Sequence, residues 1–146
     1  MSYDPCDILV VEDNPNDAEL LLRSLKKNKL ANNLYFVKDG EEALNFLFCK
    51  EEYSERKSYK NPKVIFLDLK LPKLNGLEVL EEIKTNPLTK KIPVIIVSSS
   101  REDPDIESAY ELGANSYVVK PVKFNDFMET AKQLGLYWLL VNQHPE

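Results

Sequence analysis

The chain of 146 residues is poor in cysteine and histidine and has no excess of positive charge. Its two cysteines, Cys6 and Cys49, show no metal-ligand spacing and cannot form a disulfide framework, so a reducing compartment is expected. The single histidine, His144, lies close to the end of the chain, where we assign it no catalytic role. With 19 basic and 24 acidic residues the net charge is −5, which disfavours direct binding to nucleic acid.

Long apolar runs are also absent. No stretch approaches the roughly 20 apolar residues that a membrane-spanning helix needs. No basic segment followed by an apolar one opens the chain. We therefore expect a soluble cytoplasmic protein with no membrane partner. The length suits a single domain over residues 1–146, large enough to bury a substantial core.

Short apolar runs alternate with segments of helical period, which is typical of repeated strand–helix units around a parallel sheet. The runs are rich in Val, Ile and Phe and are bounded by turn residues, so they predict strands buried on both faces. They lie at 8–11, 34–37, 64–67, 94–97 and 116–119. Five such units predict an α/β fold, a flavodoxin-like doubly wound parallel sheet of order 2-1-3-4-5 with five helices.

The helices are expected between and after these strands. The first follows the turn at Asn14–Pro15, and the second runs to about Phe48. The third stops near Asn86, because the residue before a proline disfavours the α region. The fourth starts around Pro104 and the fifth near Phe124.

Two segments depart from this regular pattern. Residues 50–61 are polar, charged and aperiodic and predict a long exposed loop, either a solvated insertion or a functional element. The extended helix from about 124 carries apolar residues on more than one side. That surplus predicts a protein contact, either a homodimer or a kinase interface, although a longer helix folding back on the domain would also account for it.

Charged side chains follow three of the predicted strands. Glu12 and Asp13 close the first run, Asp68 closes the third, and Lys120 closes the fifth. In open α/β sheets ligands bind at the carboxyl ends of the strands, so these groups are expected to meet there. Carboxylates held close together repel unless a cation compensates, and Mg²⁺ with phosphate oxygens is the natural candidate. A carboxylate can attack phosphorus, and Asp68 is the best placed nucleophile.

These residues are part of a wider pattern: an acidic pair, a further acid with Pro and Gly after it, a hydroxyl, and a Lys-Pro pair. In this chain the pattern is Glu12–Asp13, Asp68, Pro72, Gly76, Ser98 and Lys120–Pro121. It resembles the receiver domain of two-component response regulators over nearly the whole chain. Ile92–Val94, Tyr110–Ala114 and the aromatic-rich tail resemble stand-alone receivers that serve phytochrome-type histidine kinases.

The resemblance implies that Asp68 accepts a phosphoryl group from a kinase phosphohistidine. The domain would not be an enzyme for other substrates, because it would catalyse only its own phosphorylation and dephosphorylation. Asp13, Asp68 and the backbone carbonyl of Lys70 would bind Mg²⁺, and Glu12 would act through a metal-bound water.

The resemblance also implies how phosphorylation is read. Ser98 would donate its hydroxyl to one phosphoryl oxygen, and Lys120 would pair with another. Tyr117 would be the aromatic switch, turning inward when Ser98 is drawn toward the phosphoryl group and so remodelling a neighbouring surface. The Lys120–Pro121 bond would be cis.

Three classes of function follow from these residues. A single-domain regulator that signals through protein contacts is favoured, because the residues after Asn125 leave no room for a DNA-binding output domain. A Mg²⁺-dependent phosphatase or phosphotransferase of the haloacid dehalogenase type would need an acid where Lys70 stands. A scaffold receiver that acts without phosphorylation would be expected to lack site residues, and none is missing. Each residue alone has an ordinary structural role as its alternative, such as a turn or a helix cap.

Overall fold

The computed structural model describes residues 6–27, 33–56 and 61–120, and their central feature is a five-stranded parallel sheet. Its strands are β1 (Ile8–Val11), β2 (Leu34–Val37), β3 (Val64–Leu67), β4 (Val94–Ser98) and β5 (Ser116–Val119). Their order is β2-β1-β3-β4-β5 and every pairing is parallel. The predicted flavodoxin-like topology is therefore confirmed, and the predicted strands differ only in that β4 extends to Ser98.

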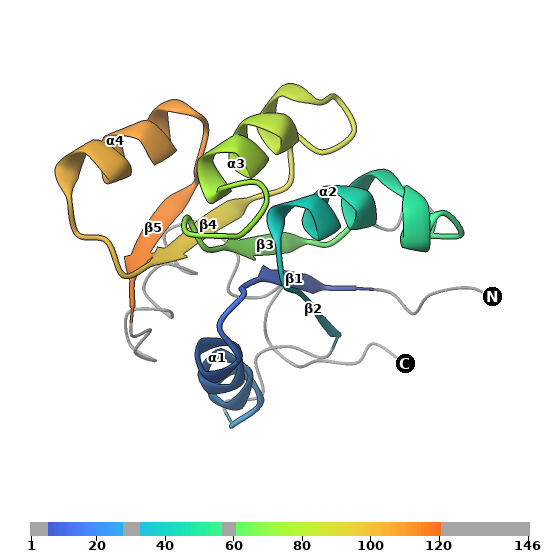
Figure 1. Cartoon of the computed structure of the whole chain (residues 1–146), viewed down its shortest axis with the longest axis horizontal. Helices are drawn as coiled ribbons and strands as arrows, with labels where there is room; N and C mark the ends of the chain where they lie inside the picture. The colour runs from blue at the N-terminus through green and yellow to red at the C-terminus, as the bar shows by residue number, and fades with distance from the viewer. Residues whose placement is uncertain (1–5, 28–32, 57–60, 121–146) are drawn as a thin grey trace.

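Helices cover both faces of this sheet. They are α1 (Pro15–Lys27), α2 (Gly40–Phe48), α3 (Gly76–Thr85) and α4 (Asp103–Glu111), with a short 3₁₀ turn, η1 (Glu51–Tyr53). Figure 1 shows α2, α3 and α4 on one side of the sheet and α1 on the other. The predicted fifth helix, the Lys120–Pro121 bond and His144 lie outside the described residues.

Side-chain caps fix where the helices begin. The Asn14 carboxamide oxygen accepts hydrogen bonds from two backbone N–H groups of the first turn of α1. Asp39 caps α2 in the same way. At α3, Asn75 and Glu78 form a complete capping box, each accepting a hydrogen bond from the backbone N–H of the other. Helix α3 ends before Asn86, as the following proline predicts.

The core lies between the sheet and the helices that cover it. Strands β1, β3 and β4 are buried at every position, which explains their continuous apolar sequences. The α2 and α3 helices contribute buried side chains from one face each: Ala43, Phe46, Leu47, Val79, Leu80 and Ile83. Within the described ranges no helix has the length and apolar content needed to cross a bilayer.

The segment after α2 differs in part from the expected exposed loop. Glu51, Glu52, Ser54 and Glu55 are exposed, but Tyr53 and Arg56 are buried, so the expectation of a long exposed loop is wrong for these two residues.

The buried side chains of Tyr53 and Arg56 are held by hydrogen bonds and by contacts with aromatic residues. The Tyr53 hydroxyl donates to Glu42 Oε2 at 2.6 Å and lies 2.9 Å from the Tyr35 hydroxyl. The Arg56 guanidinium lies 4.1 Å from the centre of the Phe46 ring, and its Nε–H donates to the Phe46 carbonyl oxygen. Long amphipathic side chains of this kind bury their bodies while their polar ends find partners, which local periodicity does not reveal.

Candidate functional site

The acidic residues predicted from the sequence converge at the carboxyl ends of β1 and β3. These strands are direct neighbours, with Val11 paired to Leu67, so the residues that follow them lie side by side. Carboxylate oxygens of Glu12, Asp13 and Asp68 all lie within 4.8 Å of one another. Glu12 and Asp68 are buried, whereas Asp13 is exposed.

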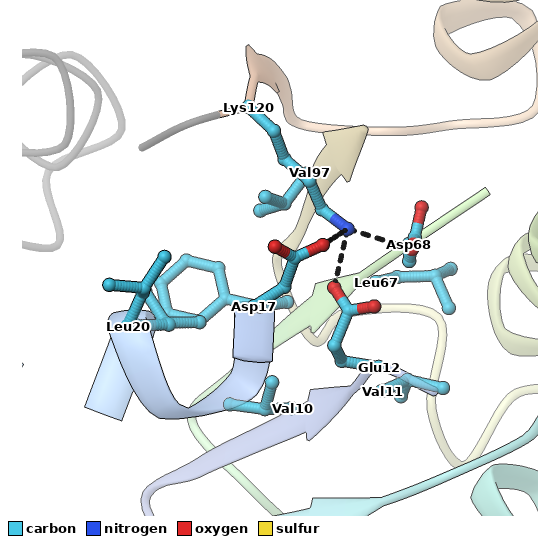
Figure 2. Close-up of a pocket in the computed structure, with 11 residues that line it drawn as sticks. Val10, Val11, Glu12, Asp17, Leu20, Leu67, Asp68, Val97 and Lys120 are labelled. Carbon is cyan, nitrogen blue, oxygen red and sulfur yellow. Dashed lines mark hydrogen bonds and ion pairs between the residues drawn. The ribbon is translucent and has the colours of Figure 1, made fainter. Parts of the chain in front are cut away.

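Lys120 reaches this acidic group from the end of β5. Its Nζ lies 2.7 Å from Glu12 Oε1, 2.9 Å from Asp17 Oδ2 and 3.0 Å from Asp68 Oδ2. Figure 2 shows the lysine side chain pointing between the three carboxylates. The predicted meeting of Lys120 with Glu12 and Asp68 is therefore observed, and Asp17 is an additional partner.

Asp17 is the site residue that sequence reasoning missed. It belongs to the first turn of α1, one helical turn beyond the acidic pair, and no strand end marks its position. The available signal was its spacing: a helix that starts at Pro15 directly after the β1 loop brings its first turn over the same edge of the sheet.

Burial and charge act in opposite directions on these groups. Burial raises the pKa of Glu12 to about 7, although its hydrogen bond to Lys120 opposes the shift. Burial tends to lower the pKa of Lys120, but its ion pairs with Glu12, Asp17 and Asp68 outweigh this effect and raise the pKa above its ordinary value. The ammonium group is therefore held in its charged form.

The donors of the cluster fit a hard divalent cation. The carboxylates of Glu12, Asp13 and Asp68 supply oxygen ligands only, and the Lys120 ammonium group pairs with the three carboxylates of Glu12, Asp17 and Asp68. Oxygen ligands from one or two carboxylates are what Mg²⁺ prefers in proteins. The Lys70 backbone N–H donates to Asp68 Oδ1 at 3.3 Å, which places that residue beside the carboxylate, while the metal-binding role of its carbonyl stays a prediction.

Ser98 ends β4, the strand between β3 and β5, and is fully buried. Its hydroxyl oxygen accepts a hydrogen bond from the backbone N–H of Ser100 at 3.2 Å. The backbone N–H of Lys120 donates to the Ser98 carbonyl oxygen at 2.9 Å. Ser98 therefore lies at the same edge of the sheet as Asp68 and Lys120, and its predicted contact with a phosphoryl oxygen stays a prediction.

Tyr117 connects β5 to the loop that leads into α4. Its hydroxyl donates to the Ser100 carbonyl oxygen at 3.0 Å, and the Ser100 hydroxyl donates to Asp105 Oδ2 at 2.5 Å. The ring is half-buried and packs against the core. These contacts describe one position of the ring. They do not test the predicted switch role of Tyr117, which stays a prediction.

A cavity of about 180 Å³ lies next to the charged groups, between α1 and the sheet. Charged residues border it at the carboxyl ends of the strands, and its other walls are aliphatic or aromatic (Figure 2). The apolar walls are Val10, Val11, Leu20, Leu21, Phe66, Leu67 and Val97. Such walls reduce local solvation, which strengthens the electrostatic interactions of the neighbouring carboxylates and ammonium group.

Known proteins with similar sequences include several response regulators. The chain is similar to "Response regulator Rcp1" from Synechocystis sp., with 37% identity over 138 residues, covering 94% of this chain and 92% of that protein. A solved structure of Rcp1 in its Mn²⁺-bound form matches with a TM-score of 0.77 at 36% identity, covering 97% of this chain and 100% of that one.

Two further solved structures of response regulators are also similar. "Bacteriophytochrome response regulator RtBRR" has a TM-score of 0.85 at 44% identity, covering 97% of this chain and 85% of that one. The phosphorylated cyanobacterial phytochrome response regulator RcpA has a TM-score of 0.77 at 34% identity, covering 98% of this chain and 100% of that one. The sequence profile described as "Response regulator receiver domain" matches residues 8–132. With its sheet order and its acidic edge, the chain therefore belongs to the response regulator receiver domain family.

Proposed function

We propose that this protein is a response regulator in which Asp68 accepts a phosphoryl group from a histidine kinase and which then signals through protein contacts. One observation carries the proposal. Asp68 is a buried carboxylate at the carboxyl end of β3, 3.0 Å from the Lys120 ammonium group and beside the carboxylates of Glu12 and Asp13. A buried nucleophile next to a fixed cation suits the transfer of a negatively charged group.

In the proposed transfer, Asp68 attacks phosphorus and Lys120 and Ser98 stabilise the phosphoryl oxygens. An Asp68 carboxylate oxygen forms the new bond to phosphorus while the bond from phosphorus to the kinase imidazole nitrogen breaks. The imidazole keeps the electron pair. Lys120 is already within ion-pair distance of Asp68 Oδ2, so it needs little movement to pair with a phosphoryl oxygen. Ser98, at the end of the neighbouring strand, would donate its hydroxyl to another.

The same edge supports a metal-assisted reaction. Mg²⁺ held by Asp13 and Asp68, with the Lys70 carbonyl and a water shared with Glu12, would neutralise the negative charge brought together by the phosphoryl group and the carboxylates. Support comes from the close oxygen cluster in this chain and from the Mn²⁺-bound form of the relative Rcp1.

A phytochrome-type histidine kinase is the partner class that we infer. The support is the 44% identity and high structural similarity to a bacteriophytochrome response regulator, together with the similarity to Rcp1 and RcpA. Homodimer formation through the C-terminal segment stays a prediction, since that segment lies outside the described residues. A cytoplasmic location and the lack of nucleic-acid binding also stay predictions.

The test is phosphorylation of the purified protein by acetyl phosphate with Mg²⁺, followed by mass spectrometry of its peptides. We expect a phosphoryl adduct on Asp68 that is lost in Asp68→Asn and that does not form when EDTA removes the metal. An equal adduct in the variant would contradict the assignment of Asp68. Steady turnover of a phosphate ester would instead support the phosphatase alternative, and kinase binding without any adduct would support the scaffold alternative.

A further inference from the structure

The first turn of α1 has an unusual arrangement of acidic groups. Asn14 caps the helix and Asp17 is its third residue, the position from which an acid commonly accepts the backbone N–H of the capping residue. Glu78 does this for Asn75 at α3. At α1 that N–H donates to Glu12 Oε2 instead, at 3.1 Å.

Asp17 is consequently free of this capping contact, and its carboxylate is used elsewhere. Its Oδ2 lies 2.9 Å from Lys120 Nζ, in a contact that spans 103 positions of sequence. An acid at the start of a helix already interacts favourably with the helix dipole. The ion pair between Asp17 and Lys120 is therefore an interaction beyond those that stabilise the start of the helix.

Lys120 has as many carboxylate partners as it has N–H donors. Glu12, Asp17 and Asp68 all lie within 3.0 Å of its Nζ, and an ammonium group has three hydrogens to donate. The proposed function requires Lys120 to pair with a phosphoryl oxygen. That pairing has to displace one of the carboxylates that the lysine holds at rest.

Asp17 is the partner that is easiest to displace. Its side chain is 36% exposed, compared with 6% for Glu12 and 7% for Asp68, so water can solvate its carboxylate once the ammonium group has left. Glu12 would be left buried without the lysine, and Asp68 has to keep its charge until its oxygen attacks phosphorus. Figure 2 shows Asp17 reaching Lys120 from α1, whereas Glu12 and Asp68 reach it from the ends of strands.

We propose that Asp17 is a positioning residue that holds Lys120 in the resting protein and is displaced from it by the phosphoryl group. This inference rests on the proposed function of Asp68. Competition by Asp17 lowers the availability of Lys120, and its negative charge opposes the approach of an anionic phosphodonor. The residue therefore slows phosphoryl transfer and raises the level of donor that the protein needs.

Asp17→Asn removes the charge and keeps the size of the side chain. We expect it to raise the rate of Asp68 phosphorylation by acetyl phosphate with saturating Mg²⁺ by about two- to fivefold, as suits a partly exposed ion pair. Glu19→Gln is the matched control. It removes the same charge from the same helix, where Glu19 pairs with Arg23 at 3.0 Å on an exposed surface. Its rate should equal that of the wild type.

A second measurement reads the displacement directly in the wild-type protein. Carboxyl ¹³C resonances are recorded with Mg²⁺ before and after saturation with beryllofluoride, an analogue of the phosphoryl group. The Asp17 carboxyl resonance should shift because it loses the Lys120 ammonium, and the Glu19 resonance should stay in place.

The outcomes separate the two proposals. If the wild type forms an Asp68 adduct but Asp17→Asn matches Glu19→Gln in rate, or the Asp17 resonance does not move, the positioning role is refuted and the proposed function stands. If the wild type forms no adduct, both are refuted. A faster Asp17→Asn variant together with a shifted Asp17 resonance supports the positioning role, which a purely structural contact would not produce.

Discussion

Replacing Lys120 by methionine removes the cation that holds the acidic cluster together. Methionine approximates the length and apolar body of lysine but leaves Glu12, Asp17 and Asp68 without the ammonium group that lies 2.7–3.0 Å from each. The Glu12 and Asp68 side chains are buried, so bulk water cannot take the place of the lost charge. The perturbation therefore tests the electrostatics of the site apart from its chemistry.

The expected cost follows from the burial of these partners. Removing one member of a buried ion pair costs about 3–5 kcal/mol, because the remaining charge is desolvated and uncompensated. Protonation limits this cost, since burial already raises the pKa of Glu12 to about 7. We expect the free energy of unfolding to fall by about 3 kcal/mol near neutral pH without metal, and Tm to fall by about 6–12 °C.

The effect should depend on pH in a defined direction. A carboxyl group whose pKa is higher in the folded protein than in the unfolded chain binds its proton preferentially in the folded state. Its contribution to stability is present at low pH and is lost as the pH rises through the folded pKa. The deficit of Lys120→Met relative to the wild type should therefore be smaller near pH 6 than near pH 8.

Urea denaturation followed by circular dichroism measures this deficit, first in EDTA and then in Mg²⁺. A ligand at about 100 times its Kd stabilises the folded state by about 2.7 kcal/mol. The uncompensated carboxylates of Lys120→Met should bind the dication more tightly, so Mg²⁺ should stabilise this variant more than the wild type. Lys63→Met is the control. Lys63, the residue before β3, is exposed, and its Nζ lies 3.6 Å from Asp7 Oδ1. Equal stability of the two variants in EDTA would refute the reasoning.

Three further predictions concern the loop after Asp68, the turn after α2 and a buried cysteine. Gly76→Ala should lower the free energy of unfolding by about 1–3 kcal/mol and slow phosphorylation, because a Cβ there overlaps the carbonyl oxygen of Asp68; urea denaturation and acetyl phosphate kinetics measure the two effects. Tyr53→Phe should cost about 1.5–3 kcal/mol in urea denaturation, because it leaves Glu42 without a hydroxyl donor at 2.6 Å. A cost near zero would show that the 3₁₀ turn is not anchored by this bond. Cys6 is buried and burial raises its pKa to about 12, so iodoacetamide should alkylate it only after unfolding, as intact mass would show.

Most of the fold could be predicted because its strands carry a strong local signal. Runs such as Ile8–Val11 and Val64–Leu67 are buried on both faces, so every position is apolar and the run is easy to delimit. The acidic edge followed from the same signal, since Glu12 and Asp68 come directly after those runs. The topology then brought together residues that lie far apart in the chain.

What could not be predicted depends on contacts between distant segments. The orientation of Asp17 toward Lys120 depends on how α1 enters its first turn, and an acid in that turn more often serves as a cap. The burial of Tyr53 depends on the rings of Tyr35 and Phe46, which belong to a strand and a helix elsewhere in the sequence. Neither relation leaves a local period in the sequence.

The anchored turn after α2, Glu51–Tyr53, is a suitable place to attach a spectroscopic label. It precedes the amino end of β3, whereas Asp68 follows the carboxyl end of the same strand, so the two lie at opposite rims of the sheet. Ser54 is exposed to solvent and lies in the sequence between Tyr53 and Arg56, whose side chains are buried. A fluorophore or spin label attached there would follow the domain while leaving the reactive rim untouched.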